Sequence, residues 1–178
     1  MVADRVRCSA FLAMSLDGFI ARKDGSIDWL ARVELPGEDY GFQRFFDSVD
    51  TLAIGRSTWE VARGFEPWPY LGKRCVVLTH RPLEARHGEE VFAGSARQLV
   101  EELSARGARH VYVDGGQVVR QFLAAGRLDA LTLSIIPLVL GEGIPLFGDA
   151  LPEQGLVLEE SRSWPSGLVQ LRYRAADR

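Results

Sequence analysis

Three segments of the chain place anion-binding groups directly after apolar runs that are typical of strands. Gly115 and Gly116 follow the run 111–113, and adjacent glycines let the backbone of a following helix approach an anion closely. Arg56 and Arg81 each come shortly after another such run. A guanidinium group binds phosphate through two parallel hydrogen bonds. These residue types therefore favour a bound phosphate or pyrophosphate.

A plain turn is the alternative interpretation of the glycine pair, because glycines commonly separate a strand from a helix. The pair also lacks the three spaced glycines of the dinucleotide fingerprint, and a single arginine is more often a solvated surface residue. However, ligands of open α/β sheets bind at the carboxyl ends of the strands. The joint placement of Arg56, Arg81 and the glycines therefore predicts a phosphorylated dinucleotide, with the two arginines on its terminal 2′-phosphate.

Asp39 is the main candidate for proton chemistry. A carboxylate can orient a heterocycle or relay a proton through water, and partial burial beside Phe42 and Trp29 would raise its pKa. The alternative is an acid that complements a helix dipole. Asp17 lies in the stretch Ser-Leu-Asp-Gly, and an Asp-Gly pair is typical of a turn. Trp29 and Phe42 are either core or lid aromatics or partners for a stacked ring.

The elements that would position these residues alternate between strand and helix. Expected strands are 6–14, 51–54, 74–78, 90–92, 111–113, 128–137, 156–161 and 168–175, and expected helices are 38–48, 95–104, 117–123 and one after Gly55. A turn rich in Asp and Gly in the segment 17–26 predicts a mobile loop above the first strand. The alternation predicts a mainly parallel sheet covered on both faces, and the last two strands predict an antiparallel hairpin.

Length and composition limit the function classes. The 178 residues show no linker and no repeat, which predicts one domain over 1–178. A formal charge of −3 argues against nucleic-acid binding. The absence of a long apolar run or leader pattern predicts a cytoplasmic protein without a membrane partner. Dispersed histidines predict no metal site, and buried, reduced thiols are expected at Cys8 and Cys75.

Five ordered segments resemble the dihydrofolate reductase-like superfamily: LAMSLDGFIA, DTLAIGRSTWE, VVLTHRP, VYVDGGQVVRQFL and LVLGEGIPLF. The closer match is the branch of the riboflavin-biosynthesis reductase domain, the C-terminal domain of bifunctional deaminase-reductases, and it covers nearly the whole chain. The resemblance implies a three-layer α/β/α fold around a mainly parallel eight-stranded sheet with an antiparallel C-terminal hairpin. It also implies NADPH as cofactor and, commonly, a homodimer, which we expect to form through the closing strands.

The activity implied by the resemblance is hydride transfer to a small heterocycle, as in 5-amino-6-(5-phosphoribosylamino)uracil reduction. Reduction of dihydrofolate or another pterin is the alternative, and a non-catalytic NADPH-binding module is an alternative of another class. Replacement of the Asp39 carboxylate would separate an enzyme from a pure binder, because only an enzyme has turnover to lose.

The resemblance also implies roles for individual residues. Ala13 and Ile20 would flank the nicotinamide, and the remaining cofactor contacts would come from Gly55, Arg56, Ser57, Thr58, Leu78, Thr79, Arg81, Gly115, Gly116, Gln117 and Val118. Trp29 is similar to a loop tryptophan that holds a water beside the substrate. Asp39 is similar to the carboxylate that grips a pterin ring, and Ser134 to the hydroxyl that supports it. Asp17 and Phe42 are the further substrate-binding candidates.

Three features depart from the riboflavin branch. Asp114 directly precedes the glycine pair, so its carboxylate must point away from a bound pyrophosphate. Phe19 replaces a lysine, and the segment 64–69 replaces an Asp-Pro-rich stretch. The last two departures concern the substrate. The cofactor-binding half of the site therefore follows the pattern of the family more closely than the substrate-binding half does.

Overall fold

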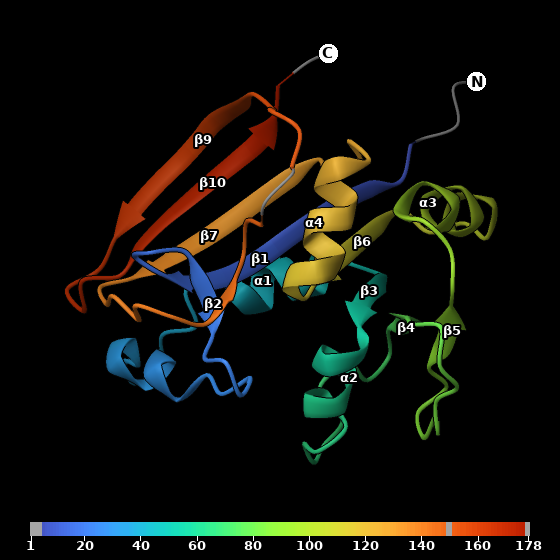
Figure 1. Ribbon diagram of the computed structural model, residues 1–178, viewed down its shortest axis with the longest axis horizontal. Coiled ribbons are helices and arrows are strands. Elements are labelled where there is room, and N and C mark those ends of the chain that lie inside the picture. The colour runs from blue at the N-terminus through green and yellow to red at the C-terminus, as the bar shows by residue number, and fades with distance from the viewer. Residues whose placement is uncertain (1–4, 149–150, 177–178) are drawn as a thin grey trace.

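An eight-stranded sheet forms the centre of the computed structural model, which describes residues 5–148 and 151–176 (Figure 1). The strand order is β5-β4-β3-β6-β1-β7-β10-β9. These strands are β1 (Arg7–Ser15), β3 (Thr51–Gly55), β4 (Arg74–Leu78), β5 (Glu90–Phe92), β6 (His110–Asp114), β7 (Ala130–Ile136), β9 (Leu156–Ser163) and β10 (Val169–Ala175). The helices are α1 (Phe42–Ser48), α2 (Arg56–Ala62), α3 (Ala96–Ala105) and α4 (Gly116–Ala124).

The strand directions confirm the predicted fold. β1 runs parallel to β6 and β7, and β3 runs parallel to β4 and β6. β10 is antiparallel to both β7 and β9. The four residues 51–54 of β3 are all buried, as expected for a central parallel strand whose two faces are both covered.

Helices on the two faces of the sheet enclose separate apolar clusters. α3 and α4 pack Leu99, Val118 and Phe122 into one cluster, whereas Trp59 of α2 lies in the other cluster with Tyr112 of β6. α3 begins where expected because Ser95 and Gln98 form a reciprocal capping box. Cys8 and Cys75 are free and buried, as predicted.

The C-terminal hairpin departs from the predicted covering of both faces. All eight residues of β9 are exposed, and Figure 1 shows β9 and β10 at the far edge of the sheet from α3. The reason is topological. None of the helices α1–α4 leads directly into β9 or β10, and the hairpin brings no helix of its own.

Three further details differ from the sequence-based expectations. The helix predicted over 38–48 starts only at Phe42, because Tyr40 and Gly41 adopt left-handed backbone conformations, with φ angles of +56° and +83°. The segment 17–26, expected as a loop, contains a strand, β2 (Phe19–Ala21), which pairs with β8 (Ile144–Pro145) in a small second sheet. A 3-10 helix, η1 (Asp28–Val33), follows this segment. Within the described ranges, no helix has the length and apolar character needed to cross a membrane.

Candidate functional site

The carboxyl ends of β3, β4 and β6 lie side by side at one edge of the sheet. Gly55 at the end of β3 is in register with Leu78 at the end of β4. Ile54 is in register with Asp114 of β6, directly before the glycine pair. The three segments predicted to bind an anion therefore meet at one edge, as the parallel topology requires.

A glycine cradle forms where the first turns of α2 and α4 meet. Gly115 has a φ of +93°, and a Cβ atom there would lie 2.7 Å from Oγ1 of Thr58. A Cβ atom on Gly116 would lie 2.8 Å from Cδ1 of Ile20. No side chain caps α4, so its first-turn N–H groups, including those of Gln117 and Val118, are suited to an anionic group.

Arg56 and Arg81 approach each other through the loop that follows β4. The Arg56 guanidinium donates to the Pro82 carbonyl at 3.1 Å and pairs with Glu60, the Nε–Oε1 distance being 2.8 Å. The exposed Arg81 comes directly before Pro82, and its backbone N–H donates to Oγ1 of Thr79 at 3.2 Å. The Arg56 guanidinium and the backbone of Arg81 therefore lie at the edge that carries the glycine cradle.

Asp39 occupies a different environment from the one predicted. Its Oδ1 accepts the Gly41 N–H at 2.8 Å, and its Oδ2 accepts the Gln43 N–H at 2.8 Å. The residue is exposed, and these two hydrogen bonds hold the pKa of the Asp39 carboxyl below its ordinary value. The prediction of a raised pKa is therefore wrong. The left-handed turn at Tyr40 and Gly41 directs the N–H groups at the start of α1 toward the carboxylate, and the alternative interpretation as a helix-start acid describes its contacts.

Asp114 is the titratable group that sequence reasoning did not select. Burial raises the pKa of the Asp114 carboxyl to about 6. Its Oδ1 accepts the Gly115 N–H at 2.8 Å. Strand alternation places it on the face of Tyr112, whose hydroxyl donates to the Phe11 carbonyl at 3.1 Å. The carboxylate thus shares the face of β6 on which Tyr112 packs against α1, and it accepts the N–H of Gly115, the N-cap residue of α4. The available signal was the alternation in HVYVD.

Trp29 and Ser134 are connected through β1, since Ala13 packs against the apolar cluster of Trp29 and is in register with Ser134. Trp29 is 5% exposed, and its buried Nε1 has no hydrogen-bond partner among the described residues. The position therefore suits a water or a ligand oxygen, and the role expected for this tryptophan stays a prediction. The Ser134 hydroxyl accepts a hydrogen bond from Gln170 at 3.0 Å, and Gln170 also donates to the Tyr40 carbonyl at 3.0 Å. Because both Asp39 oxygens bind the α1 start, Gln170 takes the place predicted for Asp39 beside Ser134.

Asp17 connects two loops. Its Oδ1 accepts the Ser15 hydroxyl at 2.6 Å and the Leu140 N–H at 3.0 Å, and its Oδ2 accepts the Gly141 N–H at 2.7 Å. The Ser15 hydrogen bond is the main reason that the pKa of Asp17 is lowered. The predicted role in substrate binding is therefore not supported, because the acceptor atoms of this carboxylate already hold the β1–β2 and β7–β8 loops together.

Phe42 belongs to an aromatic cluster beside β6 and is partly exposed. Its ring packs edge to face against Phe11 at a centroid distance of 5.5 Å and against Tyr112 at 6.1 Å. It is 37% exposed, so part of the ring remains open to a ligand. Phe42 and Asp114 therefore flank the face of Tyr112, which leaves the substrate-binding prediction for Phe42 in place.

Residues 8–170 match the family model of the RibD C-terminal domain. The chain belongs to this family. The uncharacterized protein YwjB of Bacillus subtilis is 37% identical, with 92% of this chain and 94% of that protein covered. A crystal structure of a candidate riboflavin biosynthesis protein from Shewanella sp. PV-4 has a TM-score of 0.89 and 31% identity, covering 97% of this chain and all of that one. The resemblance proposed from the sequence motifs is confirmed.

A more distant relative confirms the broader fold. The dihydrofolate reductase of Enterococcus faecalis, complexed with NADP(H), has a TM-score of 0.65 and 19% identity, with 97% of this chain and 98% of that chain covered. At this identity the likeness concerns the fold alone. The RibD C-terminal domain of this chain thus has the dihydrofolate reductase-like architecture that the motif order implied.

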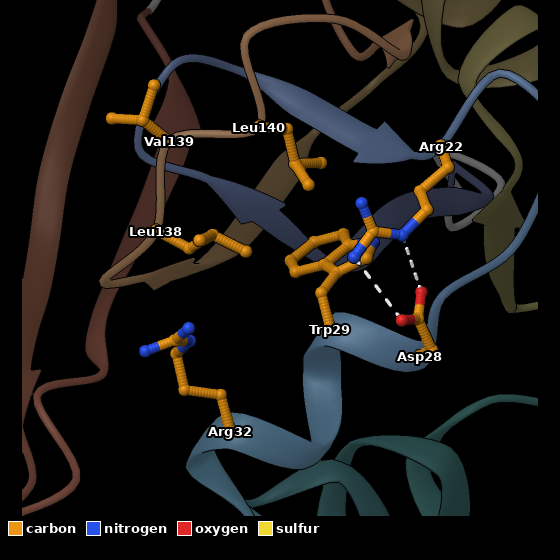
Figure 2. A pocket seen from close by; sticks show the side chains of 7 residues that line it. All are labelled: Arg22, Asp28, Trp29, Arg32, Leu138, Val139 and Leu140. Carbon is orange, nitrogen blue, oxygen red and sulfur yellow. Dashed lines mark hydrogen bonds and ion pairs between the residues drawn. The ribbon is translucent and has the colours of Figure 1, made fainter.

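A pocket of about 460 Å³ lies beside Trp29 in this RibD C-terminal domain (Figure 2). It is lined by Arg22, Asp28, Trp29, Arg32, Leu138, Val139 and Leu140. The Arg22 guanidinium binds the Asp28 carboxylate, and hydrogen bonds from Arg22 and then Ser26 lower the pKa of Asp28 to about 2. Sequence reasoning did not identify this pocket, because it forms between η1 and a loop more than a hundred residues away in the chain.

Proposed function

We propose that the protein is an NADPH-dependent reductase that transfers hydride to a small conjugated heterocycle, as pyrimidine reductases of riboflavin biosynthesis do. The observation that carries this proposal is the glycine cradle, in which Gly115 has no room for a Cβ atom against Thr58. The cradle stands at the same strand edge as Arg56 and Arg81. Membership of the RibD C-terminal domain family supports the reductase class.

The residues at this edge divide the binding of the cofactor among them. The first-turn amides of α4 would hold the pyrophosphate, and Arg56 and Arg81 would select NADPH over NADH through its 2′-phosphate. Ala13 and Ile20 would flank the nicotinamide. When bound, NADPH would supply the hydride, and the protein would supply orientation and electrostatics.

Reduction of a carbon–nitrogen double bond leaves a nitrogen that must receive a proton. Asp114 is suited to hold that proton at a carboxyl oxygen, because burial raises its pKa to about 6. Roughly a tenth of such groups stay protonated at pH 7. Asp39 is poorly suited, since hydrogen bonds from Gln43 and Gly41 lower its pKa. We therefore assign proton delivery to Asp114, and the orienting wall for the ring to Phe42.

The substrate is tested by measuring NADPH oxidation with a panel of aminopyrimidines, dihydropterins and dihydrofolate. We expect turnover with an aminopyrimidine, and much lower turnover in Asp114→Asn with NADPH affinity unchanged. Turnover with a pterin alone would replace the pyrimidine assignment by the alternative one. NADPH binding without turnover on any substrate would favour a non-catalytic binding module, and absence of NADPH binding would contradict the proposal entirely.

A further inference from the structure

We propose that the pocket beside Trp29 binds a small organic anion, namely a carboxylate or a phosphate monoester carried on an apolar body. The proposal concerns a second region of the molecule, separate from the glycine cradle. It stands on the hydrogen-bond donors, charges and apolar surface that line the pocket, and it does not depend on the proposed reductase function.

The first observation is an unpartnered donor in the pocket wall. Trp29 is 5% exposed. Its indole Nε1 is buried and has no acceptor among the described residues. A buried N–H without a partner is unfavourable, and native structures normally supply an acceptor from the protein, water or a ligand. One donor of a residue that lines the pocket is therefore left without an acceptor among the described residues.

The second observation is an excess of positive charge. Arg22 is paired with Asp28, its Nε lying 2.7 Å from Oδ1. Arg32 has no recorded ion pair or hydrogen bond with a side chain of the described residues, and Figure 2 shows Arg22 and Arg32 extending into the pocket from opposite sides of the indole. The lining of the pocket thus contains two guanidinium groups and one carboxylate. The group that complements this arrangement is an anion with several acceptor oxygens.

The third observation is the apolar wall opposite the charges. Leu138, Val139 and Leu140 line the pocket, and the Val139 side chain is 64% exposed. Such a surface favours a ligand with an aromatic or aliphatic body rather than a bare inorganic ion. The volume of about 460 Å³ is sufficient for a substituted benzoate or phenyl phosphate.

The pocket also adjoins the predicted reaction centre. Trp29 belongs to the apolar cluster against which Ala13 packs, and Ala13 is the residue expected to flank the nicotinamide. An anion held beside Trp29 would therefore be close to the reduction site without contacting the glycine cradle.

The test is a fluorine NMR titration of the whole protein with fluorobenzoate and with fluorophenyl phosphate, using fluorobenzamide as the neutral match. We expect saturable binding of at least one anion and no saturation with the amide. Arg32→Gln should weaken binding by about tenfold or more, because a charge-assisted contact is removed. Asp28→Asn should tighten binding, because it removes the competing carboxylate and releases Arg22.

The controls separate this site from general charge effects and from loss of structure. Arg109→Gln changes a side chain that is 88% exposed near the opposite end of β6 and should leave binding unchanged. Trp29→Phe keeps an aromatic ring but removes the N–H, and should weaken binding. Equal binding of the amide, or unchanged binding in Arg32→Gln, or weaker binding in Asp28→Asn would each overturn the proposal. NADPH affinity, measured in parallel, tests the reductase function independently.

Discussion

Two aspartates near the same strand edge have opposite electrostatic surroundings. Asp39 accepts two backbone N–H groups in an exposed turn, which stabilises its charged form. Asp114 accepts one N–H, but it is partly buried at the end of a strand whose three central residues are buried. Burial therefore raises the pKa of Asp114 to about 6, whereas hydrogen bonds lower the pKa of Asp39. Of these two carboxyls, Asp114 is the one that titrates near neutral pH.

The raised pKa of Asp114 has a consequence for stability. The folded carboxyl has a pKa of about 6 against an ordinary value of 3.8, so the folded state binds more protons between these values. The free energy of unfolding contributed by this group is therefore highest below about pH 4 and falls as the pH rises to about 6. Asp114→Asn should stabilise the protein at pH 8 by about 1–2 kcal/mol and by much less at pH 4.

Urea unfolding at the two pH values measures this difference. Asparagine retains an acceptor oxygen for the Gly115 N–H, so the comparison isolates the charge. The same variant should lose the fall in kcat that we expect as the pH rises through about 6, because that fall reflects deprotonation of Asp114. An equal stability difference at pH 4 and pH 8 would contradict the assignment.

Arg56 is predicted to determine the choice between NADPH and NADH. Its ion pair with Glu60 at 2.8 Å competes with a phosphate for the guanidinium. Arg56→Ala and Arg81→Ala should each cost roughly 1.5–3 kcal/mol of NADPH affinity and little NADH affinity. Glu60→Gln should instead strengthen NADPH binding. Titrations with both cofactors provide the measurement, and an unchanged preference in both arginine variants would exclude this role.

At the scale of elements, the contact between α2 and α4 explains why Gly115 is needed. Gly115→Ala places a Cβ atom 2.7 Å from Oγ1 of Thr58 in a backbone conformation with a φ of +93°. Gly107 has a comparable φ of +79° but no neighbour within 4 Å. Gly107→Ala thus measures the backbone strain alone, about 1–2 kcal/mol, and Gly115→Ala should cost more and also weaken NADPH binding. Comparable losses in the two variants would argue against the close contact.

The hydrogen bonds by which Asp17 connects two loops give a second prediction at the scale of elements. Asp17→Ala removes the acceptors for the Leu140 and Gly141 N–H groups. We expect faster amide hydrogen exchange in the segment 139–142 and little change in the central strands, because local openings are governed by local hydrogen bonds. Protection that stays the same in both loops would show that Asp17 does not hold them together.

The elements were easier to predict from sequence than the contacts between them. The bounds of β4 and β5 agree with the expected strands, because short apolar runs there end at clear turn residues. The start of α1 was missed, since the left-handed backbone at Tyr40 has no sequence signal as strong as glycine or proline. Because of that turn, Asp39 binds the N–H groups at the start of α1 and does not have the partly buried position that we expected. The pocket at Trp29 depends on contacts between distant segments, which periodicity does not reveal.

At the scale of the whole molecule, the uncovered C-terminal hairpin suggests association. Leu156, Leu158 and Val169 are 41%, 51% and 38% exposed, and Leu158 is in register with Tyr173 of β10. Paired residues share a face, so apolar side chains gather on this part of the sheet. Apolar surface of this kind is typical of interaction sites, and we propose that a second copy of the chain covers it.

Light scattering of the purified protein tests the homodimer. We expect twice the monomer mass for the unaltered protein and a monomer for Leu158→Glu, because a buried, unpaired charge at the interface is strongly unfavourable. Leu71→Glu is the matched control, since Leu71 is 77% exposed in the loop between α2 and β4. A monomeric mass for the unaltered protein at working concentration would contradict the proposal.

The most direct test of the central claim is a calorimetric titration of the protein with NADPH. If the strand edge formed by Gly55, Leu78 and Gly115 binds the cofactor, the titration will saturate at one site per chain. Binding will be weaker with NADH and in Gly115→Ala, and unchanged in Gly107→Ala. Absence of heat and of saturation with NADPH would contradict the claim that this strand edge binds the cofactor.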